Sequence, residues 1–143
     1  MSMTLKKQLG DFGENLVAKF LRDCGLNVVL SEDVFDSQKD MMAENETLEV
    51  KTLVPIKKFK AFAIEPSQWK KLDEVDRLFF VEVPEANCPV RIFESISRLY
   101  IKTYFVNGTK RMYQYSDLRL VRVIDDASTT DAIRNLSDSN YKG

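Results

Sequence analysis

Two short strands joined by a tight turn are predicted by the segment Lys39-Asp40-Met41-Met42-Ala43-Glu44-Asn45-Glu46-Thr47-Leu48-Glu49-Val50-Lys51. The strands are residues 40–43 and 47–54. Antiparallel pairing sets the start of the first strand beside the end of the second, so Asp40 could meet Glu49. Glu49 and Lys51 are two residues apart on a strand and therefore project from the same face. The pattern thus brings two acids and a lysine together on one face of a sheet.

A long amphipathic helix is expected over residues 4–24, before these strands. Its apolar residues recur at the three- and four-residue spacing of one helix face: Leu5, Leu9, Phe12, Leu16, Val17, Phe20, Leu21 and Cys24. Thr4 suits the N-cap and Gly25 suits the end of the helix. Gly10 and Gly13 each cost about 1 kcal/mol relative to Ala inside a helix, so we expect the helix to approach a sheet or a ligand closely there.

The remaining patterns complete a mixed α/β order. They predict, along the chain, a strand over 27–35, a turn at 36–38, an extra strand over 59–64, a helix over 68–76 with Ser67 as its N-cap, and a buried strand over 78–83 that Pro84 ends. Farther along they predict a hairpin of residues 100–106 and 109–115 around Asn107-Gly108, and one more strand over 118–124. Apart from the extra strand, the first part reads helix, three strands, helix, strand.

The length of 143 residues suits one domain. We expect that domain over residues 1–125, with an α/β core at about 4–84 and a C-terminal β-hairpin appendage at about 90–125. Residues 126–143 are polar and are expected to form a weakly ordered tail. No run approaches the roughly 20 apolar residues of a membrane helix. Because no targeting signal is visible either, we expect a cytoplasmic protein without membrane contact.

Composition narrows the chemistry. The 21 basic and 22 acidic residues leave a net charge of -1, which excludes a general polycation but not a local basic face. The chain has no histidine, which excludes Ser-His-Asp and Cys-His nucleophile systems and His-ligated zinc. Its two cysteines are too few for a disulfide framework. An enzyme of this composition would use carboxylates, Lys, Tyr or Cys around a hard cation bound through oxygen ligands.

Asp40, Glu49 and Lys51 suit phosphodiester hydrolysis. Two converging carboxylates form an oxygen-ligand site for Mg²⁺, which neutralises the scissile phosphate and acidifies a water molecule. An ammonium group beside them positions that water or stabilises the developing charge. The alternative is a set of ordinary exposed strand charges, since an acid two residues before a lysine is common. An Asp at a strand start, opposite Glu and Lys on the next strand, favours the site.

Three motifs in order resemble the PD-(D/E)XK nuclease superfamily over roughly residues 8–84. They are Gly10-Asp11-Phe12-Gly13-Glu14 in the first helix, Lys39-Asp40 followed by Glu49-Val50-Lys51-Thr52, and Ser67-Gln68-Trp69-Lys70-Lys71-Leu72 at the second helix. The resemblance implies a restriction endonuclease-like αβββαβ core with a mixed central sheet. One departure is that Lys39 stands where the signature has Pro, although that Pro is often absent in this superfamily.

Roles for individual residues follow from the resemblance. Asp40, Glu49 and the backbone carbonyl of Val50 would bind Mg²⁺ or Mn²⁺, and Lys51 would be the catalytic lysine. Asp36 is a rival first acid, but it falls in the predicted turn.

The same resemblance implies three auxiliary residues. Glu14 would be an outer or second-metal acid at the catalytic centre. Gln68 and Lys71 would lie near the scissile phosphate.

A basic segment adjoins the predicted site. Residues 51–71 contain six lysines and one acid, Glu65, for a net charge of +5. The candidates for contacts with a nucleic-acid backbone are Lys57, Lys58, Lys60, Lys70 and Lys71. For Lys57, Lys58 and Lys60 the alternative of an edge strand protected by lysines stays open.

The sequence therefore predicts a Mg²⁺-dependent nuclease, a hydrolase that cuts DNA phosphodiesters as an endonuclease of junction-resolving, restriction-like, or phage or homing type. DNA is the expected partner, and a homodimer is possible. The alternatives are a non-catalytic module that binds nucleic acid or another protein, and a nuclease toxin that acts on RNA.

Overall fold

The computed structural model describes residues 2–30 and 41–142. α-Helices begin and end the described chain, most of the strands follow one another between them, and three short 3₁₀ helices (η) lie among the strands. The elements are α1 (Ser2–Asp23), β1 (Val28–Leu30), β2 (Met41–Ala43), β3 (Glu46–Leu53), η1 (Lys57–Phe59), β4 (Ala61–Ile64), η2 (Pro66–Gln68), α2 (Trp69–Glu74), β5 (Arg77–Glu82), β6 (Val90–Glu94), β7 (Ile101–Phe105), β8 (Gly108–Gln114), η3 (Tyr115–Asp117), β9 (Arg119–Ile124) and α3 (Ala127–Lys142).

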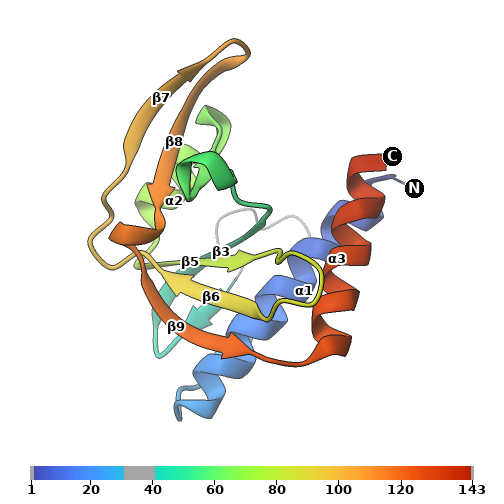
Figure 1. Cartoon of the computed structure of the whole chain (residues 1–143). Helices are drawn as coiled ribbons and strands as arrows, with labels where there is room; N and C mark the ends of the chain where they lie inside the picture. The colour runs from blue at the N-terminus through green and yellow to red at the C-terminus, as the bar shows by residue number, and fades with distance from the viewer. Residues whose placement is uncertain (1, 31–40, 143) are drawn as a thin grey trace.

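The strands form two sheets (Figure 1). The larger sheet has six strands in the order β1-β2-β3-β5-β6-β9. Its β3 and β5 are parallel, and its other neighbouring strands are antiparallel. The smaller sheet is antiparallel, with the order β4-β8-β7. The prediction of an α/β fold with a mixed central sheet is therefore confirmed.

The six-stranded sheet is covered differently on its two faces. Val17 and Leu21 of α1 pack on one face against Leu48 of β3 and Phe79 of β5. The helix α3 runs beside α1 (Figure 1) and adds Ile133 to the same core. The second face carries Leu78 and Phe80 of β5, which pack with Leu72 of α2, Phe62 of β4 and Tyr113 of β8. The sheet is thus sandwiched between a helical layer and the layer formed by α2 and the smaller sheet.

Gly13 sets the distance between α1 and the sheet. A Cβ atom built on Gly13 would lie 1.7 Å from Oγ1 of Thr52, a residue of β3. Such a separation is far inside van der Waals contact, so only glycine fits where the helix crosses this strand. The expected close approach is confirmed at Gly13. At Gly10 an approach to the sheet is wrong, because a Cβ there would meet nothing within 4 Å in the described part of the chain.

The predicted tail over residues 126–143 is wrong. Residues 127–142 form α3, and its Ile133 is fully buried. Asp126 begins the helix, since its carboxylate accepts hydrogen bonds from the backbone N–H of Ser128 (3.0 Å) and the hydroxyl of Thr129 (3.1 Å). The hydroxyl of Thr130 donates to the carbonyl of Cys88 (2.7 Å). α3 therefore has the polar composition expected of a tail, but it packs like an element of the core.

The predicted appendage over residues 90–125 is confirmed in its hairpin and in its last strand, β9, but β9 is not part of an appendage. β7 and β8 pair as expected, although Val106 and Asn107 form the two-residue turn and Gly108 opens β8 with φ +126°. β9 joins the larger sheet next to β6, a strand that the sequence did not predict.

The expected N-cap at Ser67 is also wrong: Ser67 lies inside η2, and the α-helix begins at Trp69.

The strand predicted over 27–35 is observed as β1 up to Leu30. Its continuation and the turn at 36–38, with Asp36, lie outside the described residues. Within the described part of the chain, no helix has the length and apolar character needed to cross a membrane.

The Gly13 contact yields a paired test of stability. We expect Gly13→Ala to lower the free energy of unfolding by about 1–3 kcal/mol, because the new methyl group must push Thr52 away. Gly10→Ala, the matched control in the same helix, should raise it by about 0.5–1 kcal/mol, since Ala restricts the unfolded chain and meets no neighbour. Urea unfolding of both variants measures the two changes, and equal shifts would contradict the close approach.

Candidate functional site

Strand β3 turns Glu49 and Lys51 away from α1. Leu48 and Val50 belong to the core beneath α1, whereas Leu53 packs in the core on the opposite face. Because side chains alternate along a strand, Glu49 and Lys51 share the face of Leu53, toward α2. Glu49 is 1% exposed, which is exceptional for a carboxylate and requires compensating partners.

Those partners come from three elements of the fold. The ammonium group of Lys51 lies 3.2 Å from Oε2 of Glu49 and donates a hydrogen bond to Oε1 of Gln68 at 2.6 Å. The ammonium group of Lys71, on α2, lies 3.6 Å from the same Glu49 oxygen. These four residues, Glu49, Lys51, Gln68 and Lys71, are called the Glu49 cluster below. The structure thus brings together four of the residues predicted for the site.

The Glu49 cluster is buried at its carboxylate and open at its lysines. The side chain of Glu49 is 2% exposed, that of Lys51 19% and that of Lys71 28%. Two positive charges that reach toward solvent beside a buried negative charge suit an anionic ligand that approaches from outside. The oxygen of Gln68 holds the ammonium of Lys51 in a fixed direction.

The helix that carries Lys71 is short and is held by its surroundings. Nε1 of Trp69 donates to the carbonyl of Ile64 (2.8 Å). The guanidinium group of Arg98 donates to the carbonyls of Leu72 (2.7 Å) and Val75 (2.8 Å), which satisfies the C-terminal end of α2. Arg98 adopts φ +61°, a costly conformation for a residue other than glycine. Periodicity gave no sign of this support, because Arg98 lies in an irregular loop.

A second support of α2 joins it to the smaller sheet. Arg111 of β8 makes two hydrogen bonds to Asp73, at 2.7 and 2.9 Å, and its guanidinium lies 4.9 Å from the Trp69 ring centre. The hydrogen bonds from Arg111 lower the pKa of Asp73. Sequence reasoning missed this pair, because its members are 38 residues apart and carry no motif.

Asp40 lies outside the described residues, so its predicted place beside Glu49 is untested. The register of β2 and β3 bears on it only indirectly. Met41, the residue after Asp40, pairs with Leu48, the residue before Glu49. Both Met41 and Leu48 are buried under α1.

Glu14 follows Gly13 on α1 and is half-buried. α1 packs on one face of the sheet, and the Glu49 side chain projects from the other face. The packing of α1 does not by itself place the carboxylate of Glu14 beside that of Glu49. Val50 lies in β3 between Glu49 and Lys51, so its carbonyl is adjacent to the cluster along the chain. Among residues 2–30 and 41–142, no three Asp, Glu or Cys side chains gather as a metal site.

The basic candidates divide between two places. Lys71 belongs to the Glu49 cluster, and Lys70 beside it is 85% exposed, with Glu74 at 3.8 Å. Lys57 forms an ion pair with Glu85, and its neighbour Lys58 lies over the ring of Phe59. The predicted basic segment is therefore not one continuous surface beside the site.

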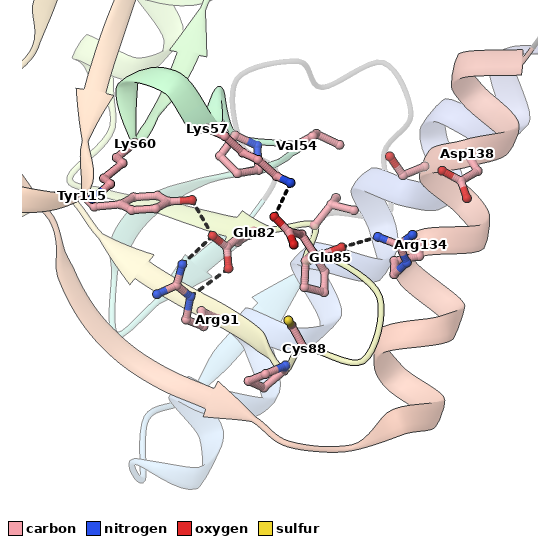
Figure 2. A pocket seen from close by; sticks show the side chains of 15 residues that line it. Val54, Lys57, Lys60, Glu82, Glu85, Cys88, Arg91, Tyr115, Arg134 and Asp138 are labelled. Carbon is pink, nitrogen blue, oxygen red and sulfur yellow. Dashed lines mark hydrogen bonds and ion pairs between the residues drawn. The ribbon is translucent and has the colours of Figure 1, made fainter.

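A separate cavity of about 850 Å³ lies past the C-terminal ends of the parallel strands β3 and β5 (Figure 2). Lys57 and Lys60 line this cavity. Its buried acid, Glu82, accepts two hydrogen bonds from Arg91, at 2.8 and 2.7 Å, and one from the hydroxyl of Tyr115. Burial, followed by this bond to Glu82, raises the pKa of Tyr115. The charges of Glu82 and Arg91 on this wall of the cavity are matched to each other.

No family model, curated protein or solved structure matches this chain. The candidate site therefore rests on its own geometry.

The cluster can be tested without assuming a function. We expect the double-mutant cycle of Glu49→Gln and Lys51→Met to give a coupling free energy of about 1–3 kcal/mol, because the pair is buried and in contact. The exposed pair of Lys7 and Asp11, which is 2.9 Å apart, is the control and should couple by no more than about 0.5 kcal/mol. Urea unfolding in EDTA measures both cycles. Equal couplings would mean that the buried pair is no stronger than a surface pair.

Proposed function

We propose that this protein is a metal-dependent nuclease of the PD-(D/E)XK superfamily, with a restriction endonuclease-like fold, which hydrolyses phosphodiester bonds of DNA. The observation that carries the proposal is the Glu49 cluster, in which the residues of the Glu-x-Lys motif meet Gln68 and Lys71 from the second helix. Apart from the extra strand β4 between β3 and α2, the order α1-β1-β2-β3-α2-β5, with β3 and β5 parallel, supports the same assignment. A cytoplasmic location and a homodimer belong to the proposal as well.

The donor set suits a hard divalent ion if Asp40 adds a second carboxylate. Glu49 offers a buried carboxylate, and Val50 offers a backbone carbonyl, both of them oxygen ligands of the kind that Mg²⁺ and Mn²⁺ prefer. Such an ion would neutralise the scissile phosphate and lower the pKa of a bound water. Glu14 is proposed as an outer acid only.

The lysines and Gln68 would act on the substrate directly. Lys51, held by Gln68, would donate to a non-bridging oxygen of the scissile phosphate or orient the attacking water. Lys71 would contact an adjoining phosphate. In the structure both ammonium groups contact Glu49. A bound phosphate would give these groups a second partner. The negative charge of Glu49 would then attract the ion more strongly. Ion and phosphate should consequently bind cooperatively.

Cleavage assays test the function itself. We expect the protein with Mg²⁺ or Mn²⁺ to cut at least one DNA among plasmid, linear duplex, junction and single-stranded substrates, and to lose that activity in EDTA. Asp40→Asn and Glu49→Gln should each abolish cleavage while the protein stays folded and still binds DNA. Cleavage of tRNA alone would indicate an RNA-acting toxin instead. Binding without cleavage of any substrate would favour a non-catalytic module.

The two roles of Lys51 can be separated by Lys51→Met. We expect cleavage to fall on the order of 10²-fold at saturating DNA, the scale of a lost electrostatic donor. Without DNA, the same variant should bind Mn²⁺ more tightly than the wild type, because one cation no longer competes for Glu49. Calorimetric titration with Mn²⁺ measures this, with Lys7→Met as the control. Weaker Mn²⁺ binding in Lys51→Met would contradict the proposed competition.

A further inference from the structure

The hairpin of β7 and β8 extends away from the rest of the molecule (Figure 1). β4 pairs with β8 only between Arg111 and Gln114. Residues 103–105 and 108–110 therefore form a ribbon of two strands, with no third strand beside them among residues 2–30 and 41–142. Isolated two-stranded ribbons are only marginally stable, so the fold gains little from this extension.

Apolar side chains are exposed along this hairpin and its approach. Tyr104 is 82% exposed, and Val106, in the turn, is fully exposed. The stretch from Ile96 to Val106 holds six of the eleven large hydrophobic side chains that are exposed in the described part of the chain. Single exposed apolar residues need no explanation, but a group of them along a projecting hairpin and its approach favours an interaction surface.

The charge of the hairpin points to an anionic partner. Residues 95–116 contain Arg98, Lys102, Lys110 and Arg111 but no Asp or Glu. Arg98 and Arg111 are engaged with α2. Lys102, at the base of the ribbon, lies over the ring of Trp69 on α2, and Lys110, in the ribbon, lies over the ring of Phe105. Two hairpins that met in a dimer would bring like charges together, which disfavours a second copy as the partner.

The hairpin is fixed to the helix that carries Lys71. Arg111 is 6% exposed and binds Asp73, two residues after Lys71, through two hydrogen bonds. A partner held by the ribbon is therefore held at a defined place relative to the Glu49 cluster. A nucleic acid is a polyanion long enough to reach both.

We propose that the β7–β8 hairpin enters the major groove of double-stranded DNA, with Lys102 and Lys110 on the phosphates and Tyr104 and Val106 against the groove floor. A two-stranded ribbon fits the B-form major groove, which is about 12 Å wide. The deep, narrow major groove of duplex RNA does not admit side chains in this way. The proposal deepens the proposed function, since it names duplex DNA as the substrate form, but it requires binding only and not cleavage.

Fluorescence anisotropy with a labelled DNA duplex of about 25 base pairs, in EDTA to prevent cleavage, tests the proposal over a range of salt. The double variant Lys102→Ala, Lys110→Ala should flatten the log–log salt dependence by nearly 2, because each phosphate contact contributes about 0.9. The double variant Tyr104→Ser, Val106→Ser should bind about 10-fold more weakly with little change in slope, as expected for lost apolar contact. Leu120→Ser, Val123→Ser on β9 is the matched control and should bind like the wild type.

The outcomes separate this proposal from the nuclease function. Wild-type affinity and slope in both hairpin variants would overturn the proposal, and so would tighter binding of an RNA duplex. Hairpin-dependent binding to phosphatidylserine vesicles or hairpin-dependent self-association, without hairpin-dependent DNA binding, would overturn it as well. If binding depends on the hairpin but no substrate is cut, the hairpin proposal stands and the nuclease proposal fails. If cleavage occurs and the hairpin variants bind and cut normally, the reverse holds.

Discussion

Strand β3 is covered on both faces, and its side chains point alternately toward α1 and toward α2. Residues that suit one of these two faces do not suit the other. Leu48 lies under α1, and Thr52 meets Gly13 there with no room for another side chain. Glu49 and Lys51 face the layer of α2. A register shift of one residue would turn the charged pair toward α1. It would also turn the apolar neighbours of that pair toward the layer of α2. The tight contact at Gly13 therefore fixes the position of the Glu49 cluster as well as the packing of the helix.

Glu49 is a costly residue to bury, and the surrounding charges show how that cost is offset. A carboxylate with 1% exposure loses several kcal/mol of hydration, and the two nearby ammonium groups compensate for part of that loss or more. Apolar residues of similar size would often stabilise such a position more. A buried acid between Lys51 and Lys71, with Gln68 orienting one of them, is thus easier to understand as chemistry than as packing.

Strong periodicity and local turn signals are what made parts of the fold predictable. The helix over α1, the strands β3 and β5 and the hairpin all follow from apolar spacing or turn residues. The helix α3 was missed because its buried face uses Thr130 and Ser137 beside Ile133. The polar composition of residues 126–143 therefore resembled that of a solvated tail. In the site, Glu49 and Lys51 could be placed on one face from their spacing. The supports from Arg98 and Arg111 could not, because long-range pairs leave no local pattern.

The extra strand β4 explains how the smaller sheet and the Glu49 cluster are connected. β4 leads through η2 into α2, so Gln68 and Lys71 follow directly from a strand of the smaller sheet. α2 has only six residues, too few to be stable alone, and it depends on Arg98, Arg111 and Trp69 for its position. A load on the β7–β8 hairpin reaches α2 through Arg111 and Asp73. Because Lys71 lies on that helix, the hairpin proposed to bind a partner and the Glu49 cluster depend on the same short helix for their positions.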